Sequence, residues 1–287
     1  MWPGKVHFPD VLNKDARKWF GDKYQVLLDQ GIEGCTWDGN RGCADQSLMA
    51  DLKACVKYGI KGIDIRFDCL NKYLEEGGTL EELNAFMKEN DIVPLSYNAL
   101  CFFNMKSTQE EKDAVMAELD DIIAKCAAID CHMVVVVPSC DLAERGIEAT
   151  RQEIRDEAVA VLKEMIKKCE PTGLKLSLEF CGAPSMSINT FDDAYEIVKL
   201  VDSPLMGVTL DQYHFNGMRS DWSKLEKADG DKIFVWHLND TEDVPAGAGD
   251  SFIAGFMEGV IRGLDIPGCL QNGAALAAQV VAQFNPY

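Results

Sequence analysis

The sequence has little positive charge for its size, and it has no long apolar run. Its 28 lysine and arginine residues stand against 47 aspartate and glutamate residues, which gives a net charge of −19. Proteins that bind nucleic acids or anionic membranes cluster lysine and arginine against phosphate, so we expect neither as a partner. No segment approaches the ~20 apolar residues of a membrane span, and residues 1–10 lack the apolar core of a signal peptide. We therefore expect a cytoplasmic protein.

The cysteines lack the spacing of a metal-binding or redox motif. There are 11 of them, none in a Cys-x-x-Cys pair, and several lie in apolar segments, as Cys126 and Cys131 do. Such cysteines are typical of small buried hydrophobic residues in a reducing compartment. In a chain of 287 residues a disulfide framework is therefore not expected.

No low-complexity linker divides the middle of the chain, where β-rich runs alternate with helical patterns. Met133–Val137 is apolar throughout, as parallel strands covered on both faces are, and Glu148–Cys169 has apolar residues at helical spacing. This alternation predicts an α/β fold with a parallel sheet, closed as a barrel or open and doubly wound. The β-rich runs are Glu33–Asp38, Gly62–Phe67, Ile92–Tyr97, His132–Pro138, Lys175–Phe180, Gly207–Asp211 and Lys232–His237; further helical patterns are Thr79–Glu89, Gln109–Ala128 and Thr190–Val201.

Acidic and histidine side chains end three consecutive β-rich runs. Glu179 ends the first, Asp211 ends the second with His214 close behind it, and His237 ends the third with Asp240 close behind it. The carboxyl ends of the strands line the active site of a β/α barrel, so we expect these side chains to converge. Mixed carboxylate and imidazole ligation suits Mn²⁺, Co²⁺, Mg²⁺ or Zn²⁺. The pattern therefore predicts a divalent metal centre.

Six segments lie in order within residues 31–247, about three quarters of the chain: GIKGIDIRFDCLNKYLEE, DIVPLSYNAL, CHMVVVVPS, LKLSLEF, GVTLDQYHF and KIFVWHLNDTEDVPAGA. Together they resemble the sugar phosphate isomerase/epimerase family with the xylose-isomerase-like barrel. The resemblance implies a (β/α)₈ TIM-barrel-like fold and a small sugar or sugar phosphate as substrate. It implies proton abstraction next to a carbonyl, which gives an enediolate that is reprotonated elsewhere.

The same resemblance implies a role for each residue at the strand ends. Glu179 is implied as a metal ligand and as the acid/base, and Asp211 and His237 as two further metal ligands. His214 is implied to contact the substrate or a second metal, and Asp240 to be a second-site or orienting carboxylate. A metal that polarises the carbonyl and hydroxyl oxygens, beside a carboxylate that moves the proton, makes this chemistry coherent.

Both ends of the chain depart from that family. The family's final strand carries a glutamate that serves as the fourth metal ligand, and no matching segment follows here. Instead residues 248–287 resemble ribokinase-like sugar kinases, whose GAGDSF motif begins at Gly247 and includes Asp250. Residues 1–30 resemble a segment of α-glucosidase-like glycoside hydrolases, which would put Asp38 near a nucleophile position. As structure, these ends are predicted to be helices at Lys14–Gln30, Asp250–Gly263 and Pro267–Gln283.

The prediction is a single barrel domain over residues 1–287. It has a core at 31–247, an atypical or missing eighth strand, an N-terminal extension at 1–30 and C-terminal helices at 248–287. The leading function is a divalent-metal-dependent sugar (phosphate) isomerase or epimerase. The alternatives are a non-catalytic or weakly active chimera that lacks the last glutamate, a metal-dependent hydrolase on the same barrel, and a sugar kinase, which would need ATP. An exposed sheet edge would favour a homo-oligomer.

Overall fold

A computed structural model describes residues 36–38, 47–237, 268, 271 and 275 of the chain. Apart from the last three residues, the described part falls within one compact unit, Cys35–His237. It lies inside the core predicted at 31–247. The helices predicted at Lys14–Gln30 and Asp250–Gly263 lie outside the described residues, and of Pro267–Gln283 only residues 268, 271 and 275 are described, each of them helical.

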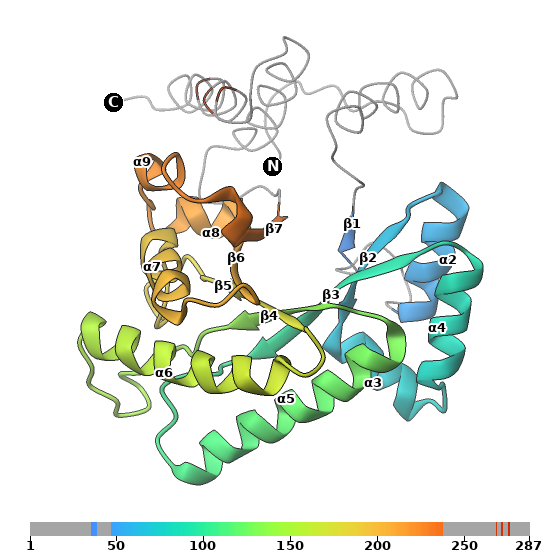
Figure 1. The fold of residues 1–287 in the computed structure, drawn as a ribbon, viewed down its shortest axis with the longest axis horizontal. Helices are drawn as coiled ribbons and strands as arrows, with labels where there is room; N and C mark the ends of the chain where they lie inside the picture. Colours follow the sequence, from blue (N-terminus) through green and yellow to red (C-terminus); the bar gives the residue numbers. More distant parts are fainter. Residues whose placement is uncertain (1–35, 39–46, 238–267, 269–270, 272–274, 276–287) are drawn as a thin grey trace, which may run out of the picture. The chain divides into compact units, whose positions relative to one another are not determined.

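The described residues contain seven strands, which form one parallel sheet in the order of the sequence. This confirms the predicted α/β barrel-like architecture, in which one or more helices lie between each described strand and the next parallel strand along the chain (Figure 1). Every run predicted as β-rich contains a strand, and β3 extends four residues beyond the predicted end at Tyr97. The strands are β1 (Thr36–Asp38), β2 (Gly62–Arg66), β3 (Val93–Cys101), β4 (Met133–Val137), β5 (Lys175–Glu179), β6 (Met206–Asp211) and β7 (Ile233–His237).

Helices cover the outer face of the sheet, and short sequence signals mark where several of them begin. Thr79, Thr108 and Thr150 each accept a hydrogen bond from the backbone N–H of a glutamate three residues later, whose carboxylate accepts one in return. This reciprocal pairing satisfies two backbone donors at each helix start. The helices are α2 (Leu48–Tyr58), α3 (Phe67–Glu75), α4 (Leu80–Glu89), α5 (Gln109–Ile129), α6 (Arg151–Cys169), α7 (Phe191–Val201), α8 (Gln212–Gly217), α9 (Trp222–Leu225) and the short 3₁₀ turn η1 (Gly230–Lys232).

The sheet curls strongly between β2 and β7. Asp64 Oδ2 on β2 lies 3.9 Å from His237 Nε2 on β7, although four strands stand between them in the sheet. Neighbouring strands are about 4.8 Å apart, so a flat sheet would separate these two strands by more than 20 Å. The contact therefore requires the barrel-like curvature that the sequence predicts, and it defines an interior.

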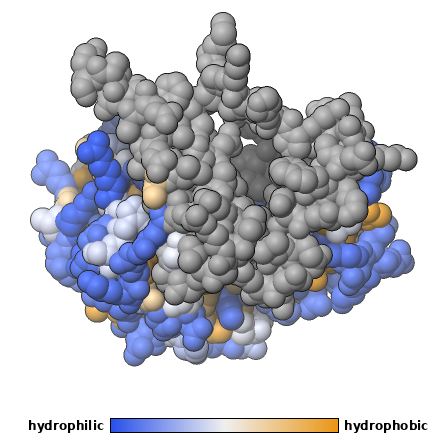
Figure 2. All heavy atoms as spheres, turned by 90° about the horizontal axis from the view of Figure 1, so that it is seen from above, coloured by the Kyte–Doolittle hydropathy of each residue, from blue (hydrophilic) through white to orange (hydrophobic). Residues whose placement is uncertain are grey.

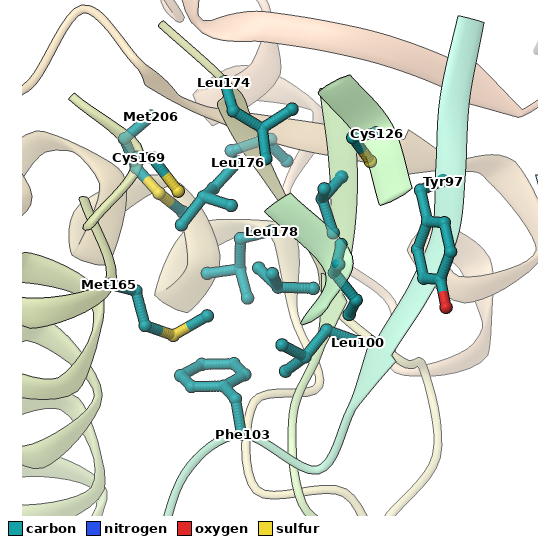
Figure 3. Close-up of a cluster of buried hydrophobic side chains, with 14 of the residues drawn as sticks. Tyr97, Leu100, Phe103, Cys126, Met165, Cys169, Leu174, Leu176, Leu178 and Met206 are labelled. Carbon is teal, nitrogen blue, oxygen red and sulfur yellow. The ribbon is translucent and has the colours of Figure 1, made fainter. Parts of the chain in front are cut away.

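Along β2, β5 and β6 the alternation of side chains puts polar residues in the interior and apolar residues in the layer under the helices. On β5, Leu176 and Leu178 are fully buried on the helix side, among Leu100, Phe103 and Met165 (Figure 3). Ser177 and Glu179, the alternate residues, therefore point to the interior. Burial of the apolar residues on the helix side drives the packing of the helices on the sheet. The polar residues on the interior side are not needed for that packing and can form a functional site.

The surface of the described part is mostly hydrophilic in the view of Figure 2, with smaller hydrophobic areas towards its edge. None of the helices in this part is long and apolar enough to cross a membrane. The eight cysteines of this part that are free of disulfides include the buried Cys126 and Cys131, as predicted.

Replacing Leu178 by alanine tests the outer packing layer. The side chain is fully buried, so we expect Leu178→Ala to lower the free energy of unfolding by about 2–5 kcal/mol through lost burial and a cavity. Urea unfolding followed by circular dichroism measures this change. Leu200→Ala on α7 is the matched control, because Leu200 is 43% exposed and its truncation should cost less than about 0.5 kcal/mol. Equal losses in the two variants would contradict the packing described.

Candidate metal centre

Glu179, Asp211, His214 and His237 meet at one end of the interior, where β5, β6 and β7 finish. His237 Nδ1 lies 3.1 Å from Glu179 Oε1 and 3.6 Å from Asp211 Oδ2. The register explains the meeting, since Asp211 pairs directly with His237 and Glu179 pairs with Thr209, two residues before Asp211. The structure thus brings these four residues together, as the strand-end pattern predicts.

The donor atoms of this cluster fit a divalent cation. Glu179, Asp211 and His214 each offer a ligand atom, and these atoms all lie within 4.8 Å of one another. His214 Nδ1 is buried and has no hydrogen-bond partner among the described residues. A buried imidazole nitrogen without a partner is costly unless a ligand completes it. Two carboxylates with imidazole nitrogens form a donor set typical of Zn²⁺, Mn²⁺ or Co²⁺.

Asp211 links the end of β6 to the helix that carries His214. Its Oδ1 atom accepts a hydrogen bond of 3.0 Å from the backbone N–H of His214 and so caps the start of α8. An aspartate at this position satisfies a backbone donor that the helix leaves open. Its other oxygen, Oδ2, is the one that faces His237. One residue therefore orients α8 and presents an oxygen to the cluster.

Close backbone packing also fixes His214 beside Glu179. A Cβ atom on Gly182, three residues after Glu179, would collide with the backbone carbonyl of His214. Only glycine permits such an approach between two backbones. Behind the cluster, Phe215 packs on Phe180 with ring centroids 6.5 Å apart and on Trp222 at 4.5 Å. The residues next to Glu179 and His214 thus anchor both in an aromatic core.

The charges around His237 change its protonation. Burial by itself lowers the pKa of His237, but hydrogen bonds to Asp211 and Glu179 and the charges of Glu179 and Asp64 outweigh it and raise the pKa to about 10. The metal-free protein therefore holds His237 as an imidazolium. Burial, together with the charges of Glu179 and Asp211, raises the pKa of Cys181, so this thiol stays protonated in the metal-free protein.

Three further residues complete the comparison with the predicted site. Asp240 lies outside the described residues, and for Asp38 only the backbone is described, at the end of β1. Asp64, on β2, is missing from the predicted set, although it lies 3.9 Å from His237. Its signal in the sequence is a single acidic residue between Ile63 and Ile65, which are both fully buried on the opposite face. An aspartate there must point to the interior.

The pKa of His237 predicts how the stability of the metal-free protein depends on pH. A pKa raised from 6.5 to about 10 on folding contributes stability that is complete below pH 6.5 and is lost as the pH rises through 10. The groups that face this ring are Glu179, Asp211 and Asp64. In urea unfolding with a chelator present, the excess stability of the wild type over His237→Gln should shrink between pH 6.5 and pH 10. A constant difference would contradict this protonation.

Curated relatives match most of the chain. An inosose isomerase from Halalkalibacterium halodurans is 41% identical over 204 residues, which are 71% of this chain and 70% of that protein. An inosose isomerase from Bacillus subtilis is 38% identical over 204 residues, 71% of each chain. Among solved structures, the IOLI protein with a binding zinc atom superposes with a TM-score of 0.66 at 29% identity, covering 84% of this chain and 95% of that one.

A more distant structure has the same fold. The 3-keto-D-glucoside 4-epimerase of E. coli superposes with a TM-score of 0.62 over 86% of this chain and 98% of that one, at 15% identity. The predicted glucosidase segment has a short counterpart: alpha-glucosidase 2 of Bacillus thermoamyloliquefaciens is 55% identical over 40 residues, 14% of this chain and 5% of that protein. That length does not support a chimera, and of the predicted kinase segment at 248–287 only residues 268, 271 and 275 are described.

The family comparison agrees with the fold and with the curated relatives. The family model described as xylose isomerase-like TIM barrel matches residues 52–267, which is more than half of the chain. The match takes in β2 through β7 and all four residues of the cluster. The chain therefore belongs to the xylose isomerase-like TIM barrel family.

Proposed function

We propose that this chain is a divalent-metal-dependent isomerase of a small polyhydroxy ketone of the inosose class. The observation that carries the proposal is the convergence of two carboxylates and two imidazoles at the carboxyl ends of β5, β6 and β7. The curated relatives named inosose isomerase, at 38% and 41% identity, support the reaction and the substrate.

The electrostatics of the interior favour an uncharged substrate. Asp64, Glu179 and Asp211 are all buried, with 8% or less of each residue exposed. A phosphate group placed among these carboxylates would meet like charges in a poorly solvated site. We therefore propose a free polyol ketone rather than a sugar phosphate.

In this proposal, Glu179, Asp211 and His237 hold the metal, and His214 either orients the substrate or adds a further nitrogen ligand. The buried and unpartnered His214 Nδ1 supports both roles. When bound, the metal supplies polarisation of the ketone and the adjacent hydroxyl. The zinc atom bound by the IOLI protein, which is 29% identical, supports a divalent metal in this fold.

Glu179 is the proposed acid/base. Its carboxylate takes the proton from the carbinol carbon next to the ketone, and the electron pair forms the carbon–carbon double bond of an enediolate. The same carboxylate then returns the proton to the former carbonyl carbon, while the hydroxyl proton moves between the two oxygens. The carbonyl has then moved by one carbon, with no net change in atoms or electrons.

One carboxylate on one face of the substrate is enough for this transfer between adjacent carbons. Inversion at a single carbon needs a proton donor on the opposite face as well. Among the residues that the structure describes, the cluster contains one glutamate, Glu179. Glu179 by itself therefore suffices for the proposed isomerisation.

The proposal is tested with chelator-treated protein reloaded with Mn²⁺, Co²⁺, Mg²⁺ or Zn²⁺. The protein is incubated in D₂O with inosose and with a panel of free and phosphorylated ketoses, and deuterium on carbon is measured by mass spectrometry. We expect exchange and isomerisation of inosose in at least one metal form. Because general acid–base catalysis contributes about 10²–10⁴-fold, Glu179→Gln should lower the rate by at least about 100-fold.

Glu164→Gln is the matched control, since Glu164 is an exposed residue of α6 that pairs with Lys167. This variant should keep the wild-type rate. Metal binding by the wild type without exchange on any ketone would overturn the isomerase and favour the non-catalytic barrel. Release of a hydrolysis product in place of an isomer would favour the metal-dependent hydrolase.

A further inference from the structure

We propose that Asp64 is a positioning residue that orients His237 and fixes which of its nitrogens carries the proton. The proposal rests on the metal centre of the proposed function, and it adds a second carboxylate contact behind one of the metal ligands. Its evidence is that Asp64 lies nearest to Nε2 of the imidazole, whereas Glu179 and Asp211 lie nearest to Nδ1.

Asp64 is held rigidly in the interior. It is 3% exposed, in the middle of β2, and its register partner on β3 is Ser96, which is fully buried. The Ser96 hydroxyl donates a hydrogen bond of 2.6 Å to Asp64 Oδ1. That bond fixes the rotation of the carboxylate, so that Oδ2 is the oxygen nearer to His237.

The imidazole of His237 stands between two sets of carboxylates. Nδ1 faces Glu179 Oε1 at 3.1 Å and Asp211 Oδ2 at 3.6 Å. Nε2 faces Asp64 Oδ2 at 3.9 Å, which is about 1 Å longer than a hydrogen bond. A 180° flip of the ring about the Cβ–Cγ bond would put carbon atoms in the places of Nδ1 and Nε2 and would lose all three contacts.

A histidine that binds a metal must have one nitrogen free of its proton and the other protonated. A neutral imidazole has one bare nitrogen for the metal and one N–H, and the partner of the N–H decides which nitrogen is which. Metal-bound histidines nearly always donate this second N–H to a carboxylate, a carbonyl or water. With a metal held by Glu179, Asp211 and Nδ1, the carboxylate of Asp64 beside Nε2 would favour the tautomer that keeps the proton on Nε2 and leaves Nδ1 bare.

Asp64 also lies at a different position along its strand from the residues of the metal centre. Glu179, Asp211 and His237 each end a strand, whereas Asp64 lies two residues before the end of β2 at Arg66. Its Oδ1 atom is engaged by Ser96. The geometry therefore gives Asp64 the role of a partner to the ligand rather than that of a ligand.

Asp64→Asn is the direct test, because it keeps the size of the side chain. Ser96 still donates to the amide oxygen, so the new NH₂ group faces His237 Nε2. A donor there disfavours Nε2–H and favours the tautomer with Nδ1 protonated, which blocks the metal face. Titration calorimetry with Zn²⁺ and Mn²⁺ should show affinity about 10–100-fold weaker than in the wild type.

A spectroscopic signal separates this role from a merely structural one. The chain has four histidines, so the imidazole nitrogens of the Zn²⁺-loaded protein can be assigned by ¹H–¹⁵N NMR with His237→Gln as the reference. We expect a slowly exchanging Nε2–H on His237 in the wild type. In Asp64→Asn the Nε2–H resonance should be lost and the ¹⁵N shifts of the ring should move to those of the other tautomer, which a change in stability alone would not produce.

Two further variants keep the test decisive. Asp51→Asn is the matched control, since Asp51 is 2% exposed but lies on α2, outside the sheet; it should leave the affinity for Zn²⁺ unchanged. Ser96→Ala removes the hydroxyl that holds Asp64 and should weaken Zn²⁺ binding in the same direction. It supplies the measurement if Asp64→Asn does not fold.

The outcomes distinguish this proposal from the proposed function. A wild type that binds none of the four divalent metals overturns both. A wild type that binds Zn²⁺, with affinity and the Nε2–H signal unchanged in Asp64→Asn or in Ser96→Ala, overturns the role of Asp64 and leaves the metal centre standing. Weaker binding in both variants, with Asp51→Asn unchanged, supports the role.

Discussion

The curvature of the parallel sheet is the constraint on which the rest of this structure depends. Strands β2 and β7 carry residues that touch, Asp64 and His237, although four strands lie between them in the sheet order. Right-handed twist, accumulated strand by strand, lets a parallel sheet curl in this way. Without that curvature the strand ends would lie along a line, and Asp64 would not reach Nε2 of His237.

Because side chains point alternately to the two faces of the sheet, the curved sheet has an outer face under the helices and an inner face around the interior. The outward residues are large and apolar and pack under the helices, as Leu176 and Leu178 do (Figure 3). The inward residues of the same strands are polar, and Ser177 and Thr209 even share a hydrogen bond of 2.6 Å inside the sheet. The helix layer supplies the burial that stabilises the fold, and the interior can therefore hold carboxylates that would otherwise be too costly to bury.

The residues at the strand ends are held in position by contacts with the residues that surround them. Asp211 caps α8 while it presents its second oxygen, and Gly182 allows the backbone of His214 to approach. The ring of Phe215 packs between Phe180 and Trp222. These contacts hold the side chains in place before any ligand arrives, which is the condition for a metal site of defined geometry.

The sequence by itself determined the parallel α/β architecture, the strand positions and the expectation that Glu179, Asp211, His214 and His237 converge, because strand periodicity and strand-end chemistry are local patterns. It also indicated the family, through segments within residues 31–247, and the family model matches residues 52–267. Only the tertiary structure decided which nitrogen of His237 faces Glu179 and that Asp64 lies behind the ring. Those relations join strands far apart in the sheet, and their distances depend on how tightly the whole sheet curls, which no short stretch of sequence encodes.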